Sequence, residues 1–280
     1  MRELNANEIL IAVSDLVKRA NYDLNSDLLN ALLAAEKMEE STIGQEIIKQ
    51  LIENQEIARN EDVPICQDTG FAVFFVELGQ DLRIVGGDIE SAINVGVSRG
   101  YREGYLRKSI VEHPFNRTNT GDNTPAIIHY RIVPGERLRL RFMAKGGGSE
   151  NMSFSRMLTP ADGVEGVKNF VYESVVAAGG RPCPPIIVGV GIGGTMEKAA
   201  LLAKESLLRT IGERNPLPDI AALEEDLLKL INKSGIGPQG LGGRITALAV
   251  NIEIFPTHIA TLPVVINIGC HATRHQEIIL

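Results

Sequence analysis

The first part of the chain carries apolar residues at helical spacing. Between residues 4 and 58 these positions recur with a period close to 3.6, which predicts amphipathic helices. Asn25, Ser26 and Asp27 are candidate capping residues between two of them. The N-terminal part, about residues 1–60, is therefore expected to be helical.

Further along, helical periodicity alternates with runs that predict strands. The predicted helices span residues 89–106, 161–178 and 195–210, and Thr195 is a candidate cap for the last. The predicted strands span residues 71–78, 126–133, 138–144, 186–190, 246–254 and 262–268. Pro134, Gly135 and Glu136 predict that the second and third strands form a hairpin. The fold class is α/β mixed (α+β), with a helical N-terminal region packed on a mixed β-sheet and surrounding helices, in one domain covering residues 1–280.

Glycines follow the strand predicted at residues 186–190. Gly189, Gly191 and Gly194 satisfy the GxGxxG pattern, which raises the hypothesis of a nucleotide-binding oxidoreductase. Roughly 20 residues further on, where such a fold places a ribose-binding acid after a second strand, Glu213 and its neighbours follow a helix instead. We therefore expect these glycines to let the backbone close up near Cys183 and to expose amides that hold an anion.

Composition narrows the choice of partners. The 280 residues are 44% hydrophobic and 22% charged, as in globular proteins with a substantial core. The net charge of −7 without a Lys/Arg-rich run argues against nucleic acid or an anionic membrane as a partner. No apolar run approaches the roughly 20 residues of a membrane span, and the first residues lack a signal-peptide pattern. A cytoplasmic location is therefore expected.

The three cysteines lie in segments rich in Pro, Gly or polar residues. Cys66, Cys183 and Cys270 show no CxxC spacing, so a zinc ribbon or a thioredoxin-type site is unsupported. Free cysteines are often simply buried apolar residues, and that alternative stays open, including a structural subunit whose cysteines merely pack. Three thiolates can also hold three corners of a four-iron cluster and leave the fourth iron open as a Lewis acid.

Five separated motifs, in this order, carry a resemblance to a known family. They are Cys66-Gln67-Asp68-Thr69-Gly70, Lys145-Gly146-Gly147-Gly148-Ser149-Glu150-Asn151, Gly191-Ile192-Gly193-Gly194-Thr195, Gly237-Pro238-Gln239-Gly240 and Ile268-Gly269-Cys270-His271-Ala272-Thr273-Arg274-His275. Together they resemble the alpha subunit of the class I, iron-sulfur fumarate hydratase and L(+)-tartrate dehydratase family. The C-terminal domain of the one-chain members is expected to be absent, which implies a separate beta subunit and an alpha2beta2 assembly.

The resemblance implies an oxygen-sensitive hydro-lyase. In that family three cysteines hold a 4Fe-4S cluster, and the matching positions here are Cys66, Cys183 and Cys270. The implied reaction is the reversible hydration of fumarate to (S)-malate, a step of the tricarboxylic acid cycle. The alternative is L(+)-tartrate dehydratase. The base that removes the carbon-bound proton is expected on the beta subunit, so this chain would supply the Lewis acid and part of the pocket for a small dicarboxylate.

The resemblance also implies substrate contacts next to the first cysteine. It places Gln67 and Asp68 against the substrate, with Asp68 able to orient the substrate hydroxyl, although Asp68-Thr69-Gly70 can equally be a turn closed by an Asx hydrogen bond. Arg107 resembles the family's carboxylate-binding arginine, whose planar fork suits a dicarboxylate; by itself it is an ordinary solvated charge.

Two further segments complete the predicted site. Gly147, Gly148 and Ser149 can bring backbone amides close to a carboxylate, although the exit of a hairpin is the simpler interpretation. His258 aligns with a histidine near the substrate in relatives, and a satisfied core histidine is the competing view. His271 and His275 flank the third cysteine, and their roles stay open.

Overall fold

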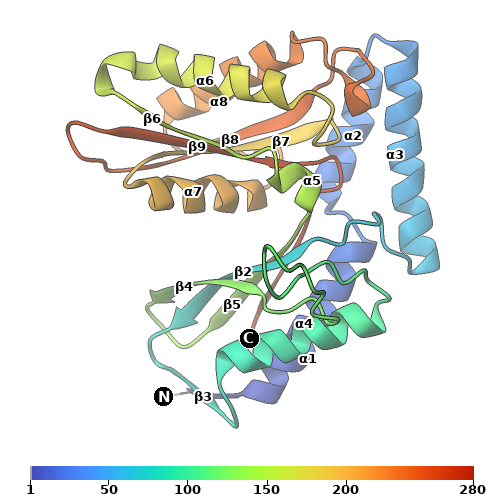
Figure 1. Cartoon of the computed structure of the whole chain (residues 1–280), viewed down its shortest axis with the longest axis vertical. Coiled ribbons are helices and arrows are strands. Elements are labelled where there is room, and N and C mark those ends of the chain that lie inside the picture. The colour runs from blue at the N-terminus through green and yellow to red at the C-terminus, as the bar shows by residue number, and fades with distance from the viewer. Residues whose placement is uncertain (1) are drawn as a thin grey trace. The chain divides into compact units, whose positions relative to one another are not determined.

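The structure is a computed structural model that describes residues 2–280. The chain divides into two compact units, whose helices and strands are drawn in Figure 1. Each unit has its own apolar core. Unit 1 comprises residues 2–25, 54–147 and 272–280, and unit 2 comprises residues 26–53 and 148–271. The mixed α/β fold class is confirmed, whereas a single cluster-binding domain stays a prediction.

Unit 1 contains the helices α1 and α4, the last residues of a third helix, and two small sheets. Its elements are β1 (Arg2–Asn5), α1 (Ala6–Tyr22), β2 (Phe71–Gly79), β3 (Leu82–Val85), α4 (Ile89–Glu103), β4 (Ile127–Val133), β5 (Leu138–Lys145) and β10 (Arg274–Ile279). The larger sheet has the order β10-β5-β2-β4, in which β4 runs parallel to β2 and the other neighbours are antiparallel. β1 and β3 form a separate parallel pair.

The predicted hairpin at Pro134 is wrong. β4 and β5 do not pair with each other, because β2 lies between them and bonds to both. The apolar run of β2, buried from Ala72 to Val76, explains this arrangement, since a strand covered on both faces takes a central place in a sheet. The connection at residues 134–137 crosses the end of β2, where Gly79 N–H donates to Arg137 O.

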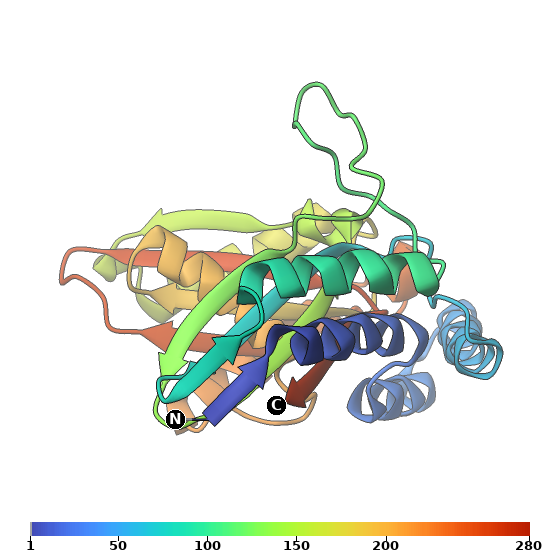
Figure 2. The same ribbon diagram turned by 90° about the horizontal axis from the view of Figure 1, so that it is seen from below.

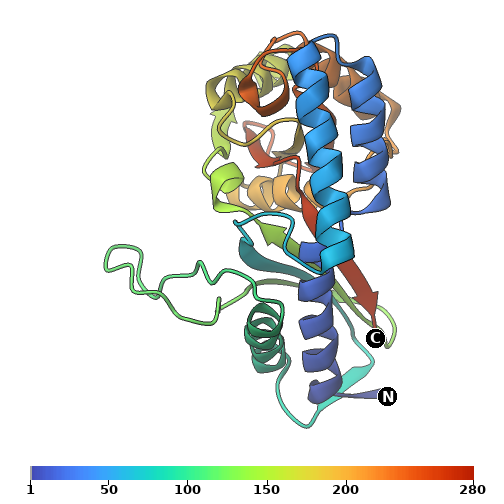
Figure 3. The ribbon, with the colours of Figure 1, turned by 90° about the vertical axis from the view of Figure 1, so that its right-hand side faces the viewer.

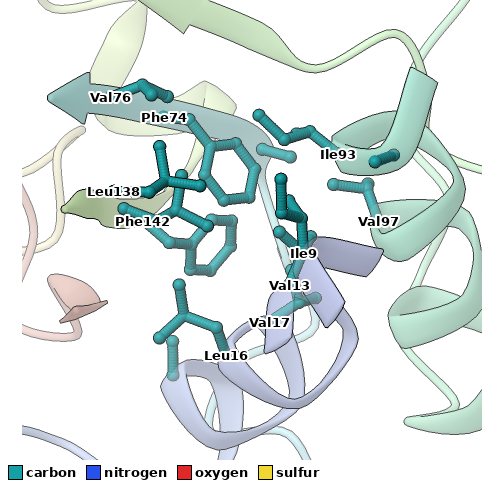
Figure 4. Close-up of a cluster of buried hydrophobic side chains, with 14 of the residues drawn as sticks. Ile9, Val13, Leu16, Val17, Phe74, Val76, Ile93, Val97, Leu138 and Phe142 are labelled. Carbon is teal, nitrogen blue, oxygen red and sulfur yellow. The ribbon is translucent and has the colours of Figure 1, made fainter. Parts of the chain in front are cut away.

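The core of unit 1 lies between its larger sheet and the helices α1 and α4. Figure 4 shows Ile9 and Val13 of α1 and Ile93 of α4 facing Phe74 of β2 and Phe142 of β5. The helical spacing of the apolar residues in α1 and α4 places them on one face, and burial of that face stabilises the helices more than their intrinsic propensity does. The predicted helix at residues 89–106 is confirmed as α4.

Unit 2 is a four-stranded sheet with helices on both faces. Its elements are α2 (Ser26–Met38), α3 (Thr42–Glu61, which continues into unit 1 after residue 53), α5 (Gly147–Glu150, whose first residue belongs to unit 1), β6 (Phe154–Leu158), α6 (Gly163–Ala178), β7 (Ile186–Gly193), α7 (Met196–Glu205), α8 (Pro218–Asn232), β8 (Ala247–Phe255) and β9 (Leu262–Gly269). The sheet order is β6-β9-β7-β8, with β7 and β8 parallel. α6 and α8 cover one face and α7 the other (Figure 1).

The glycines of β7 make room for a helix. A Cβ at Gly189 would lie 2.2 Å from Ala203 O, and a Cβ at Gly191 would lie 2.0 Å from Ala199 O, both in α7. The expectation that these glycines close the backbone near Cys183 is therefore wrong, because the space they leave is filled by α7. Packing of α7 against β7 accounts for two of the three glycines of the GxGxxG pattern, Gly189 and Gly191.

Several elements have no counterpart in the prediction. They are β1, β3, α5, β6, α8 and β10. α8 has a clear helical pattern from Ile220 to Ile231. The prolines and glycines on either side of it favoured an irregular segment instead. β10 pairs with β5 only because the tertiary fold brings the end of the chain back to that edge.

A long irregular loop joins α4 to β4. Residues 107–123 extend away from α1 and α4 (Figures 2 and 3), and most of their side chains are exposed. The loop is closed at its base, where Thr120 N–H donates to Ile110 O. Within residues 2–280, no helix combines the length and apolar character needed to cross a bilayer.

Candidate active site

In unit 1, the segment from Cys66 to Gly70, here called the Cys66 loop, leads from α3 into β2. Cys66 and Asp68 are half-buried and Gln67 is exposed. The Cys66 thiol donates to Gln67 Oε1 at 3.1 Å. The thiol and the two predicted substrate contacts therefore share one accessible stretch of chain.

The Asp68 carboxylate joins two segments of unit 1. Its Oδ1 accepts from Gly70 N–H at 3.1 Å, which is the Asx turn considered from the sequence. Its Oδ2 accepts from Gly147 N–H at 2.8 Å, so the same side chain also ties the Cys66 loop to the end of β5. Each carboxylate oxygen has a second lone pair, and Asp68 can still accept a hydrogen bond from a ligand.

Arg107 lies against the Cys66 loop. Its backbone carbonyl accepts from Thr69 Oγ1 at 2.7 Å, and its side chain is exposed. No ion pair engages Arg107 among the described residues of the chain. The guanidinium is thus available to an anion, as the resemblance implies for a carboxylate-binding residue, and this role stays a prediction.

Gly70 fixes the course of the loop where β2 begins. Its φ is +72°, and a Cβ there would lie 2.6 Å from the backbone carbon of Lys145. Any other residue would combine a left-handed backbone with a collision against β5. The close approach of Gly70 to β5 also brings Gly147, two residues beyond Lys145, within reach of Asp68.

Three consecutive carbonyls of this loop accept hydrogen bonds from buried side chains. Asp68 O accepts from Arg274 Nη2 at 2.6 Å. The Tyr101 hydroxyl lies 2.6 Å from Thr69 O and 3.1 Å from Gly70 O, and Asn123 Nδ2 donates to Gly70 O at 3.1 Å. Arg274, Tyr101 and Asn123 are each at most 1% exposed. Burial raises the pKa of Tyr101, so its hydroxyl stays protonated and acts as a donor.

None of these three donors was among the site residues predicted from the sequence. Tyr101 continues the apolar series Ile93 and Val97 at a spacing of four residues, so a core position was predictable, and a buried tyrosine hydroxyl usually needs an acceptor. Arg274 lies inside the motif that follows Cys270, without an apolar pattern to indicate its burial. Asn123 ends a polar loop whose path the sequence does not define.

The segment after β5 forms a short helix. Gly147 begins α5, and Ser149 is buried while Gly148 is exposed. Gly147 N–H is engaged by Asp68, whereas a Cβ at Gly148 would meet nothing within 4 Å. The interpretation as a hairpin exit is wrong, and the substrate-binding roles of Gly147, Gly148 and Ser149 stay predictions.

In unit 2, Cys183 lies in a tight turn before β7. Its φ is +57°, its N–H donates to Gly180 O, and its side chain is exposed. The turn rests against the loop at Gly237–Gly240, where a Cβ on Gly240 would lie 2.6 Å from the Cα of Gly180. The two loops thus pack backbone against backbone, which only glycines at this contact permit.

Cys270 follows the end of β9 and is held beside the Cys183 turn. His271 N–H donates to Cys183 O at 3.3 Å, and His271 Nδ1 lies 3.0 Å from the same oxygen. Gln239 Nε2 lies 3.1 Å from His271 Nδ1 and donates to Pro184 O at 2.7 Å. Depending on its tautomer, His271 therefore donates to Cys183 or accepts from Gln239. Two of the three predicted ligand segments meet in unit 2.

The donor set fits an iron-sulfur cluster chemically. None of the three cysteines forms a disulfide, and none is buried, unlike most free cysteines. Three accessible thiols are suitable ligands for such a cluster. Within residues 2–280 there is no ready group of three His, Cys, Asp or Glu side chains arranged around a metal ion. Cys66 belongs to unit 1, and the ligand set stays a prediction.

His258 lies in the connection between β8 and β9 and is exposed. Its Nδ1 accepts from Ala260 N–H at 3.2 Å, so the alternative of a core histidine is wrong. β9 separates His258 from Cys270, and its eight residues extend about 26 Å at 3.3 Å per residue. The fold of unit 2 therefore does not bring His258 to Cys270, and its catalytic role stays a prediction.

Comparison with known proteins identifies relatives over nearly the whole chain. The model of the family described as fumarate hydratase (Fumerase) matches residues 11–279. A protein of Methanocaldococcus jannaschii, provisionally named L(+)-tartrate dehydratase subunit alpha, is 47% identical over 270 residues, covering 94% of each chain. L(+)-tartrate dehydratase subunit alpha of Escherichia coli O157:H7 is 33% identical over 278 residues, covering 98% of this chain and 91% of the relative.

Proposed function

Because the chain belongs to the fumarate hydratase (Fumerase) family, whose members are hydro-lyases, we propose that it is the alpha subunit of a two-subunit iron-sulfur enzyme that reversibly hydrates fumarate to (S)-malate. The partner would be a beta subunit in an alpha2beta2 assembly, and the naming of the relatives as alpha subunits supports such a partner. A cytoplasmic location suits an oxygen-sensitive cluster and thiols that must stay reduced.

One observation carries the proposal: the Arg107 backbone is bonded to Thr69, the neighbour of Asp68 in the Cys66 loop. Thr69 Oγ1 bonds to the Arg107 backbone, while Asp68, the residue before Thr69, keeps acceptor capacity beside an accessible thiol. A cation and a hydrogen-bond acceptor next to a cluster ligand are the groups that a hydroxy-dicarboxylate requires.

The three cysteines, Arg107, Asp68 and Gln67 each have a defined part in this proposal. Cys66, Cys183 and Cys270 would hold a 4Fe-4S cluster, which when bound supplies an open iron as a Lewis acid for the substrate hydroxyl. Arg107 would bind a substrate carboxylate through its planar fork. Asp68 would accept a hydrogen bond from the hydroxyl and, with Gln67, orient it. The carbon-bound proton would go to a base on the beta subunit.

L(+)-tartrate is the second candidate substrate. The names of the relatives favour it, whereas the description of the family model favours fumarate. Tartrate carries one more hydroxyl than malate, and a site built to bond that hydroxyl discriminates strongly against a substrate without it. The residues that would contact it are expected partly on the beta subunit.

The test is an anaerobic assay of the chain with and without its beta subunit. We expect about four irons per alpha chain and a brown colour that air bleaches. Fumarate, (S)-malate and L(+)-tartrate are then compared by kcat/KM, and the preferred substrate decides between the two candidates. Tight NAD binding without iron would instead support the oxidoreductase, and colourless protein with inert thiols the structural subunit.

A further inference from the structure

Arg274 is a buried cation for which residues 2–280 provide no anionic partner. It is 1% exposed, and no ion pair to it exists among residues 2–280. Its guanidinium donates instead to three neutral oxygens: Ala272 O through Nε, Asn21 Oδ1 through Nη1 and Asp68 O through Nη2. A buried charge without a counter-charge is costly, and neutral donors would satisfy the same oxygens. Stability alone therefore does not explain why an arginine occupies position 274.

The geometry around the Cys66 loop indicates another reason. The carbonyls of Asp68, Thr69 and Gly70 all accept hydrogen bonds from buried side chains. These bonds fix the orientation of the three peptide groups. Gln67 is exposed and Asp68 is half-buried on the same segment. A loop with this many fixed peptide groups gives the side chains it carries a defined position.

The positive charge of Arg274 is also close enough to Asp68 to favour an anionic ligand there. Arg274 Nη2 lies 2.6 Å from the carbonyl of Asp68, the residue proposed to contact substrate. In a poorly solvated setting a cation acts over a longer range than at the surface, and it favours an anionic ligand. The substrate of the proposed reaction is a dianion.

We propose that Arg274 is a positioning residue for the reaction, which together with Tyr101 and Asn123 fixes residues 68–70 and thereby sets the Gln67 and Asp68 side chains for a dicarboxylate. This inference rests on the proposed function for its substrate. Arg274 does not touch the reacting atoms; it acts through Asp68. The conservative replacement by lysine keeps the charge but cannot supply three donors in a planar fork.

The main variant is Arg274→Lys, in the alpha chain purified anaerobically with its beta subunit. We expect kcat/KM to fall at least about tenfold with iron per chain at the wild-type level. Hydrogen exchange of the backbone amides in residues 66–75 should accelerate. Arg83→Lys, at an exposed position on β3, is the matched control and should leave both measurements unchanged. Wild-type exchange and kinetics in Arg274→Lys would overturn the proposal.

Tyr101→Phe provides the second variant, because it removes only a hydroxyl and preserves the packed ring. It should also lower kcat/KM, by about three- to tenfold, and accelerate exchange in residues 66–75. Its matched control is Tyr130→Phe on β4, whose hydroxyl is not part of the loop. A lower Tm with unaltered kinetics and loop exchange would mean that both residues are merely structural, and would refute positioning.

Hydrogen exchange tests the positioning role of Arg274 separately from the proposed hydro-lyase function. If the wild-type enzyme neither hydrates fumarate nor dehydrates (S)-malate or L(+)-tartrate, the proposed function fails regardless of Arg274. Faster exchange confined to residues 66–75 in Arg274→Lys would then still support positioning of the loop, whereas an active wild type with unaltered variants would refute positioning alone.

Discussion

The Cys66 loop of unit 1 and the Cys183 turn of unit 2 are both irregular segments that carry a predicted cluster ligand, yet they are held differently. In the Cys66 loop, buried side chains such as Tyr101 and Arg274 donate to backbone carbonyls. In the Cys183 turn, backbone packs against backbone at Gly180 and Gly240. The first arrangement is sensitive to lost donors and the second to added Cβ atoms.

The difference follows from what surrounds each segment. The Cys66 loop lies over α4 and β10, whose side chains reach it from a packed core. The Cys183 turn faces another loop, and two irregular backbones pack closely only where neither carries a side chain. Gly70 shows that the contrast is one of degree, since it too leaves no space for a Cβ.

The largest effect is expected when one of the three predicted cluster ligands is removed. Replacement of Cys66, Cys183 or Cys270 by Ser should abolish cluster retention and reduce activity to background, because two thiolates do not anchor a cluster that needs three. Iron and sulfide content of anaerobic protein measures this, with chelator-stripped wild type as the reference. Normal iron in one variant would remove that cysteine from the ligand set.

Arg107→Ala tests the carboxylate-binding role proposed for Arg107, whose backbone bonds to Thr69 of the Cys66 loop. We expect wild-type iron content but a loss of roughly 2 to 5 kcal/mol in transition-state stabilisation if the pair with a carboxylate is desolvated. Steady-state kcat/KM measures the loss. Arg117→Ala, in the exposed loop of residues 107–123 that also contains Arg107, is the control and should change little. Equal kinetics for the two variants would exclude Arg107 from the pocket.

Gly240→Ala tests the backbone contact of unit 2. Its φ of +74° and the collision with Gly180 should lower the free energy of unfolding by about 2 to 4 kcal/mol. Gly148→Ala, where a Cβ meets nothing within 4 Å, should stay within about 0.5 kcal/mol of wild type. Denaturant unfolding compares them, and equal stability would contradict the proposed packing.

Glu39 is a buried charge in unit 2 that, like Arg274, binds backbone groups. Its carboxylate accepts from the N–H groups of Glu40, Ser41, Arg244 and Ile245. Burial opposes its ionisation, but these hydrogen bonds outweigh burial and lower the pKa of Glu39 below the ordinary 4.5. Ionised Glu39 therefore stabilises the fold fully above pH 4.5, and this contribution is lost as the pH falls through the lower folded-state pKa.

Glu39→Gln should accordingly lower stability by about 2 to 3 kcal/mol at neutral pH, since an amide presents donors to donors. The gap to wild type should narrow on acidification. Unfolding curves at several pH values measure it, with the exposed Glu40→Gln expected to cost at most about 1 kcal/mol. A gap that does not change with pH would show that Glu39 is not ionised in the fold.

Local patterns predicted the parts of the molecule that depend on near neighbours in the chain. The apolar face of α4 and the buried run of β2 were predictable because burial of one face follows from spacing. The pairing of β4 was not, because a short connection allows either a hairpin or a crossing over the end of β2. The glycines of β7 were misinterpreted for the same reason, since their partner α7 is known only after folding.

In the candidate site, too, the residue types follow from the sequence, whereas the contacts between them follow only from the structure. The sequence determined the chemistry: three thiols in Gly- and Pro-rich segments, an aspartate next to one of them, and an arginine able to bind a carboxylate. Only the tertiary structure decided that Arg107 contacts the Cys66 loop, that Cys183 meets the segment after Cys270, and that Arg274 is buried beneath Asp68. Residue types fix which reactions are available, whereas hydrogen bonds between segments distant in the chain form only when the chain folds, and each of these bonds lies within one unit.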